Sequence, residues 1–338
     1  MTDATRVPAP PSDSPRPTLN DEDAHLAEFG YAQKLDRSVG KLASFAIGFA
    51  TISATTAVFT GFGAGYFTAG GPFVWTLLLA AAVFLIWVFI AADLTAKIPL
   101  AGYAYQWTSR IHGSTLAWFT GVMALAGWIC GMTGVGFILS GYLGGLFGWD
   151  MSQTVQIFVA IGVMAICMLV NMYGVRFATM VNNIGVSLEF VITIGATILV
   201  AIVAFSAPEN HQPFSVLFTG GTSDGSTPYI LAWLAASLGP FFGLIGVEAS
   251  ADVAEETKNA RHVIPRTMFY ALTASIVIEF LMYVVFVLAI KDSAAVEANA
   301  AAPIEEIINQ QVGPIITKIV VAVALTNVMA CILANILV

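Results

Sequence analysis

Three glutamates lie within long apolar stretches of this 338-residue chain, at positions 189, 248 and 279. Carboxylates are costly in a hydrocarbon environment, so a glutamate in such a stretch is a functional candidate by default. Glu248 ends the uncharged run that begins at Tyr229. Burial there disfavours the charged form, whereas the N-terminal end of a following helix favours it. We therefore predict that Glu248 exchanges protons; the alternative is that it is simply the first residue outside a membrane.

The other two acids differ in their depth within the apolar stretches. Glu279 lies in the middle of its stretch, and we predict it as the second proton-coupling residue. Glu189 lies nearer an end of its apolar stretch, and we interpret it as a residue that water hydrates. No lysine or arginine lies inside a stretch where it could pair with either acid.

Two of the apolar stretches contain features that interrupt a helix. Residues 43–66 have hydroxyl side chains near their middle, at Ser53, Thr55 and Thr56, and three glycines near their end. Residues 227–251 contain Pro240, which lacks a backbone donor, followed by Gly243 and Gly246. These are the first and sixth stretches, and paired interrupted helices of this kind indicate a secondary transporter with its site at the midplane. The alternative is that the small residues serve helix packing, as the G-x-x-x-G spacings at 61–65 and 239–243 indicate.

Composition defines the class of elements that must hold these residues. The chain is 58% hydrophobic and 10% charged, whereas soluble domains are about a quarter charged. Its mean hydropathy is +0.83. Because only helices or closed barrels satisfy backbone groups in lipid, and barrel strands would alternate in short segments, we predict an all-α polytopic membrane protein. Eight spans are expected, at residues 43–66, 73–96, 114–146, 153–173, 182–205, 227–251, 264–290 and 313–338.

The distribution of lysine and arginine predicts the orientation. Lys41, Arg110, Arg176 and Lys258 lie in alternate connections, while the loops around 67–72, 147–152 and 206–226 have no basic residue. The positive-inside rule therefore places the N-terminus in the cytoplasm. The expected location is the cytoplasmic (inner) membrane. Residues 1–42, rich in proline and acids, are expected to form a disordered cytoplasmic tail. The chain ends inside its last apolar stretch, and we expect it to be truncated after the eighth span.

Several function classes lack support in the sequence. Residues 221–225 match G-x-S-x-G, but they lie in a polar loop without the partners that a hydrolase needs. The histidines are scattered, and three cysteines lie in three different spans, so neither a metal site nor a disulfide framework is expected. We predict no enzymatic activity, no cofactor and no nucleic-acid partner. The alternative to a transporter is a membrane channel or a sensor without carrier activity.

Four motifs carry a resemblance to a known family. They are "ADLTAKIPLAGYAYQWTSRIHG" at 91–112, "AWFTG" at 117–121, "NMYGVRF" at 171–177 and "GVEASADVAEETKNARHVIPRTM" at 246–268. Together they resemble the amino acid–polyamine–organocation permeases, in particular bacterial amino acid permeases near the γ-aminobutyrate/choline branch and the arginine/agmatine antiporters. The resemblance implies a leucine-transporter-type inverted-repeat fold, of which this chain has the first repeat and part of the second.

The resemblance also implies particular site residues. Thr55-Thr56-Ala57 corresponds to the family's small G-[ST]-G loop without its glycines, and Phe242 corresponds to an aromatic residue that stacks on substrate. A glutamate at the position of Glu248 is implicated in proton sensing among the antiporters. The coupling ion is expected to be the proton, with sodium and plain exchange left open. The predicted substrate-binding residues are Ser53, Thr55, Thr56, Ala57, Phe242, Gly243, Gly246 and Glu248.

The polarity of the two breaks predicts how a ligand binds. A half-helix that starts near Thr56 presents amide groups and a positive end, which favour a carboxylate. A half-helix that ends near Gly243 presents unpaired carbonyl groups, which favour an ammonium group. The predicted substrate is therefore an amino acid or a related amine, held between the two breaks and covered by Phe242.

Overall fold

The computed structural model describes residues 26–30, 34–35, 37–149, 152–173, 189, 193–219 and 228–337. Residues 37–338 form one compact unit, separate from residues 1–36. Within the described residues every regular element is helical, apart from an isolated bridge between Val39 and Thr257. The protein is thus an all-α polytopic membrane protein. Its helices are α2 (Lys41–Ile52), α3 (Ala54–Ala69), η1 (Gly71–Trp75), α4 (Thr76–Lys97), α5 (Tyr103–His112), α6 (Ser114–Phe147), α7 (Gln153–Tyr173), η2 (Pro208–Asn210), η3 (Phe214–Leu217), α9 (Tyr229–Ala236), α10 (Leu238–Gly243), α11 (Ala249–Asp252), η4 (Ala254–Glu256), α12 (Ala260–Leu288), α13 (Ser293–Ala298), α14 (Pro303–Val312) and α15 (Pro314–Leu337).

Six helical segments of the described chain are long and apolar enough to cross a membrane. Two other predicted spans are not among these six. Much of 182–205 lies outside the described residues, and its described apolar helix is Thr193–Ala204. The predicted span 227–251 is divided into α9, α10 and α11, with a five-residue stretch of turns after Gly243. The six long segments are Lys41–Ala69, Gly71–Lys97, Ser114–Phe147, Gln153–Met172, Ala260–Leu288 and Pro314–Leu333.

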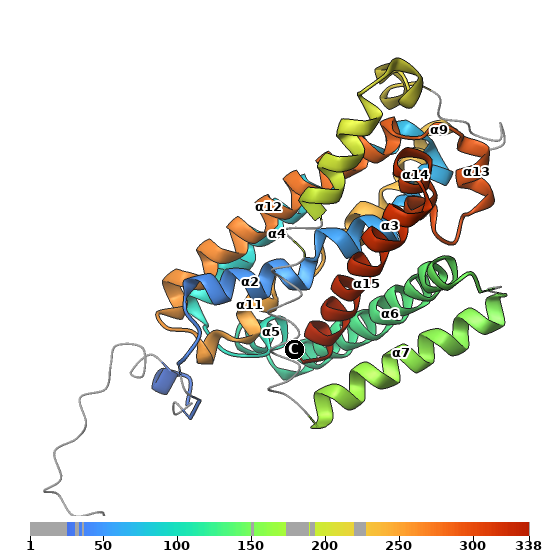
Figure 1. Ribbon diagram of the computed structural model, residues 1–338. Helices are drawn as coiled ribbons and strands as arrows, with labels where there is room; N and C mark the ends of the chain where they lie inside the picture. The colour runs from blue at the N-terminus through green and yellow to red at the C-terminus, as the bar shows by residue number, and fades with distance from the viewer. Residues whose placement is uncertain are drawn as a thin grey trace, which may run out of the picture. The chain divides into compact units, whose positions relative to one another are not determined.

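The first segment lies at the centre of the helical unit, and the others surround it (Figure 1). Helix α12 packs along α2 and α4, while α10 packs on α3. On the other side, α6 and α7 run together, and α15 contacts both of them as well as α2 and α3. The most apolar window of Lys41–Ala69 is 72% buried, compared with 11% for Gln153–Met172. The broken first segment is therefore enclosed by protein, whereas α7 presents apolar side chains outward.

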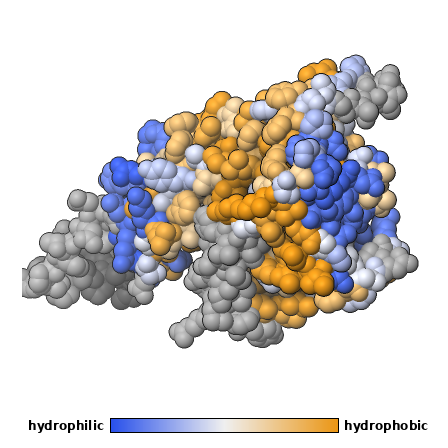
Figure 2. All heavy atoms as spheres, turned by 45° about the horizontal axis from the view of Figure 1, so that its top comes forward, coloured by the Kyte–Doolittle hydropathy of each residue, from blue (hydrophilic) through white to orange (hydrophobic). Residues whose placement is uncertain are grey.

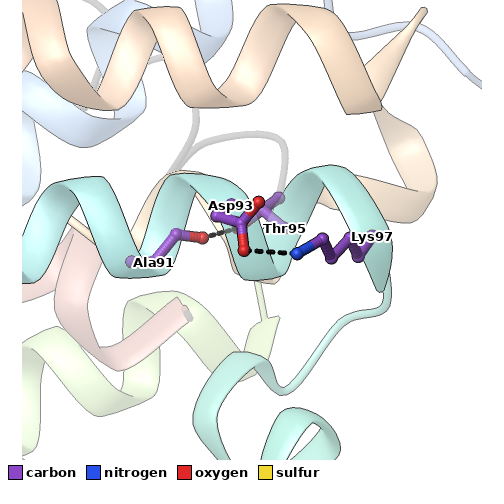
Figure 3. A network of polar contacts seen from close by, with 4 residues as sticks. All are labelled: Ala91, Asp93, Thr95 and Lys97. Atoms are coloured by element: carbon purple, nitrogen blue, oxygen red, sulfur yellow. Dashed lines mark hydrogen bonds and ion pairs between the residues drawn. The ribbon is translucent and has the colours of Figure 1, made fainter.

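The surface of the unit carries the pattern expected for a membrane protein. Hydrophobic residues form a band between hydrophilic regions at the two ends of the face shown in Figure 2. Exposed phenylalanine, leucine and isoleucine side chains of α4, α6 and α7 belong to the apolar surface, among them Phe89, Leu125 and Phe158. At the end of α4, Lys97 Nζ lies 2.7 Å from Asp93 Oδ2, and both side chains are exposed (Figure 3). This ion pair lies in the last turns of the apolar helix.

The segment before α2 is attached to the end of the interrupted sixth span. Val39 N donates to Glu256 O at 3.0 Å, and Lys258 N donates to Val39 O at 2.9 Å. Helix α2 already begins at Lys41. The prediction of a disordered tail through residue 42 is therefore wrong at its end, because backbone pairing with residues 256–258 fixes Val39. Most of residues 1–36 lie outside the described residues.

Carboxylates from the same end of the sixth span hold the connection between α4 and α5. Asp252 Oδ1 accepts from Gly102 N at 3.1 Å, and Glu255 Oε1 accepts from Ala101 N at 3.2 Å. These amides immediately precede α5, where a helix N-terminus favours negative charge. The acidic residues that follow Glu248 thus connect two signature segments of the chain.

Candidate substrate site between two broken helices

The first break is a single residue, Ser53, between α2 and α3. Its φ of 47° and ψ of 90° are unusual for a residue other than glycine. The Ser53 hydroxyl accepts from Thr56 N at 3.3 Å and forms a 2.8 Å hydrogen bond with the Thr56 hydroxyl. Because serine is a preferred N-cap residue, it begins the second half-helix at Ala54. The expected start near Thr56 is therefore two residues too late, and Thr55-Thr56-Ala57 form the first turn of α3 instead of a loop.

The second break follows Gly243, where α10 ends. Gly246 has a φ of +108°, a backbone conformation that residues with a side chain rarely adopt. A Cβ atom on Gly246 would lie 2.8 Å from Thr51 Cγ2, and one on Gly243 would lie 2.8 Å from Ala57 Cβ. The two breaks therefore lie directly against each other, and glycine is required at both contacts.

The outer halves of the two helices approach each other just as closely. A Cβ atom on Gly239 would lie 2.5 Å from the Gly61 carbonyl oxygen. This confirms the packing interpretation of the G-x-x-x-G spacings for Gly61 and Gly239. Close helix packing and a helix break are therefore not exclusive interpretations of these glycines. The contact between α3 and α10 at Gly61 and Gly239 accompanies the contact between the two breaks.

A cavity of about 510 Å³ lies beside the two breaks. Five predicted residues line it: Thr56, Ala57, Phe242, Gly243 and Glu248. The three others have different positions. Ser53 and Thr55 are buried behind it, and Gly246 packs on Thr51. The remaining wall is mainly apolar and includes Ile52, Met132, Val135 and Ile245.

Glu248 supplies the carboxylate of this cavity and immediately precedes α11. Its side chain is 8% exposed. The Trp87 side chain and the Gly246 backbone are hydrogen-bonding partners, while its Oε2 has none among the described residues. This position differs from that of a first residue outside a membrane, because the carboxyl group is buried at the cavity wall and one of its oxygens has no partner among the described residues.

The other intramembrane acids lie behind the cavity wall. Glu279 on α12 is fully buried, and its Oε2 would lie 3.1 Å from a Cβ atom on Gly243. Glu189 is 3% exposed and accepts from Thr55 N at 3.4 Å. The interpretation of Glu189 as a hydrated residue is therefore wrong, because its side chain is buried against the start of α3.

Most of the other lining residues are not predicted from the sequence, and four of them with polar side chains are Tyr103, Trp128, Cys331 and Asn335. Tyr103 follows the Pro-x-Ala-Gly segment, so its signature was a signal that could have identified it. Burial raises the pKa of the Tyr103 phenol to about 12, so it remains a hydrogen-bond donor. The other three come from α6 and α15, where nothing in the local pattern distinguishes a cavity-facing residue from a packing residue.

No cluster of three or more histidine, cysteine or acidic side chains that could hold a metal ion occurs within the described residues. The cavity chemistry is therefore that of an apolar pocket with one carboxylate, two phenol or indole donors, and the ends of interrupted helices.

The family model described as "Amino acid permease" matches residues 39–338. The chain belongs to the amino acid permease family. It is 27% identical to the branched-chain amino acid permease BcaP of Bacillus subtilis over 258 residues. This aligned region covers 71% of this chain and 52% of that protein. It is 25% identical over 280 residues to the amino-acid permease BAT1 of Arabidopsis thaliana, covering 77% and 53%.

A second bacterial relative has a similar likeness. The branched-chain amino acid permease BcaP of Lactococcus lactis is 27% identical over 284 residues, covering 80% of this chain and 59% of that protein. The chain thus spans about half the length of the curated relatives it matches. Membership of the family and a multi-pass arrangement of helices agree with the expectations drawn from the sequence.

Proposed function

We propose that the protein is a secondary active transporter that moves an amino acid or a related amine across the cytoplasmic membrane by alternating access. The supporting observation is the cavity between two interrupted helices, because interrupted spans place unpaired backbone groups at a buried site. Family membership and relatives named as amino acid permeases support the same function.

The lining of the cavity supports a substrate with an apolar side chain. Phe242, Met132 and Val135 offer hydrocarbon surface, and the carboxylate of Glu248 attracts an ammonium group. Two relatives are named as branched-chain amino acid permeases, which makes leucine, isoleucine and valine the first ligands to test. γ-Aminobutyrate and simple amines form the second group.

Glu248 is the proposed proton-responsive group of the cavity. It lines the cavity and one of its oxygens has no partner among the described residues, so its charge acts on a cationic group bound there. Glu279, the second predicted proton-coupling residue, is separated from the cavity by Gly243. A coupling proton is proposed, with the N-terminus on the cytoplasmic side.

Uptake of radiolabelled leucine into proteoliposomes containing the full chain tests the proposal. We expect saturable uptake that competing branched-chain amino acids inhibit and that unlabelled leucine on the opposite side accelerates. A channel would give uptake without such acceleration. Inhibition by sugars, nucleobases or dicarboxylates but by no amino acid or amine would contradict the proposed substrate class.

A further inference from the structure

A buried carboxylate caps the half-helix that begins at the first break. Glu189 Oε1 accepts from Thr55 N at 3.4 Å, and the Ser53 hydroxyl is a further hydrogen-bonding partner. Four residues along the chain from Glu189, the Thr193 hydroxyl is hydrogen-bonded to the Thr55 hydroxyl. The N-terminal end of α3 is therefore occupied by a side chain of the fifth predicted span, and its partial positive charge favours the carboxylate.

A second buried carboxyl group lies close to the first. Glu279 is fully buried, and neither of its oxygens has a hydrogen-bonding partner among the described residues. Glu189 and Glu279 are near enough to interact electrostatically. Two neighbouring buried carboxyl groups without a cation do not both ionise. Since the described hydrogen-bond donors are directed at Glu189, this arrangement favours the negative charge on Glu189 and the proton on Glu279.

The other titratable groups around the pair leave this assignment unchanged. Cys331 on α15 interacts electrostatically with Glu189, and Tyr283 on α12 does so with Glu279. The Tyr283 hydroxyl donates to Ala57 O at 3.4 Å. Both groups are neutral as thiol and phenol. The partners recorded for the two glutamates within the described residues include no lysine, arginine or histidine.

The charge on Glu189 has a consequence for ligand binding. The proposed function places the substrate carboxylate at the N-terminal end of α3, and Thr56 of that turn lines the cavity. The carboxyl group of Glu189 already occupies this end, where its hydrogen bonds favour the charged form. A second carboxylate arriving there is repelled unless the first is neutralised.

We infer that Glu189 takes up a proton from water when a substrate carboxylate binds at the start of α3, and returns it when the substrate leaves. This inference rests on the proposed function. The proton is transferred to a carboxylate oxygen of Glu189, which removes the charge behind the cavity wall at Thr56. No covalent bond of the substrate changes. Glu189 thereby couples carboxylate binding to one proton, in a role separate from that of Glu248 toward the ammonium group.

Proton uptake on ligand binding tests the inference directly. The full chain in detergent is titrated with leucine in a weakly buffered solution that contains a pH indicator. Isoamylamine, which is leucine without its carboxylate, serves as the matched ligand, and thermal shifts report binding of both. We expect about one proton taken up per leucine bound at neutral pH, and none for isoamylamine.

Three variants distinguish a proton-binding role from a structural one. E189Q should bind leucine without proton uptake, whereas T193V removes a neighbouring hydroxyl and should retain it. E279Q replaces a neutral carboxyl group by a neutral amide and should also retain it. Proton uptake by E189Q at the wild-type level would overturn the inference. Loss of proton uptake in E279Q would overturn it as well, and this second variant decides the matter if E189Q does not fold.

The failure of the inference and that of the proposed function give different results. If the wild-type chain bound neither leucine nor any other amino acid or amine, the proposed function itself would be contradicted. If leucine bound without proton uptake, or if isoamylamine caused the same uptake, only the role of Glu189 would be lost.

Discussion

At the scale of single residues, Glu248 is the group on which the cavity depends for charge. Glu248→Gln should lower leucine uptake by about tenfold and flatten its pH dependence, because an amide neither attracts an ammonium group strongly nor changes charge. Uptake into proteoliposomes over a series of pH values measures both effects. Glu209→Gln, at an exposed position of η2, is the control. A mutant profile parallel to that of the wild type would remove the proton role of Glu248.

Gly246 allows a second test at this scale. Its positive φ and the 2.8 Å approach to Thr51 both oppose a side chain. Gly246→Ala should therefore lower the free energy of unfolding by about 1–3 kcal/mol and reduce uptake, because the two breaks are pushed apart. Thermal unfolding in detergent provides the measurement. Gly162→Ala on α7, where nothing lies within 4 Å of the added Cβ atom, should have little effect, and equal destabilisation by both variants would contradict this account.

Much of the site could be predicted residue by residue because its members stand out in an apolar sequence. Glu248, Phe242 and Thr56 were identified by charge, by resemblance and by hydroxyl content, and all three line the cavity. Cys331 and Asn335 were not, since only the packing of α15 against α2 and α3 brings them to the cavity. Glu189 was misjudged because distance from the end of a stretch does not report how neighbouring helices bury a residue.

At the scale of elements, the acids after Glu248 connect α11 to the start of α5. Asp252 accepts from the Gly102 amide, and burial raises the pKa of its carboxyl group to about 7, with the charge of Glu248 as a smaller cause. A raised pKa means that the folded protein favours the protonated form. Stability from this group is therefore fully present below the ordinary pKa of about 4 and is lost as the pH rises through about 7.

Asp252→Asn should remove this dependence. The amide oxygen of asparagine can still accept from Gly102, while the side chain has no charge to acquire. Thermal unfolding between about pH 4 and about pH 8 should therefore decline less steeply in the variant than in the wild type. Asp93→Asn, at an exposed ion pair on α4, is the control. A variant that declined as steeply as the wild type would show that Asp252 does not titrate in this range.

The elements themselves were predicted unevenly, for physical reasons. Long apolar runs identify α4, α6, α7, α12 and α15 because lipid requires such runs. The break at Ser53 was expected within the right span but two residues too late, since composition lowers helix propensity over a whole stretch and only the side-chain cap defines where α3 begins. The short helices α5, α13 and α14 lie in connections whose mixed composition has no membrane signal.

At the scale of the whole molecule, the orientation in the membrane remains a prediction from basic residues. Lys258 and the segment paired with it are placed in the cytoplasm, and the connection that contains Glu209 is placed outside. Single cysteines at these two exposed positions, in a chain whose exposed Cys130 is replaced by serine, give a direct test. A membrane-impermeant maleimide applied to intact cells should label Glu209→Cys and leave Lys258→Cys unlabelled until the cells are opened.

The physical reason for this expected labelling is that lysine and arginine are retained on the side from which the chain is inserted, and the charged residues next to Lys258 follow the same rule. Labelling of Lys258→Cys in intact cells, with Glu209→Cys protected, would invert the orientation and would place the carboxylates of Asp252 and Glu255 at the outer end of the transport path.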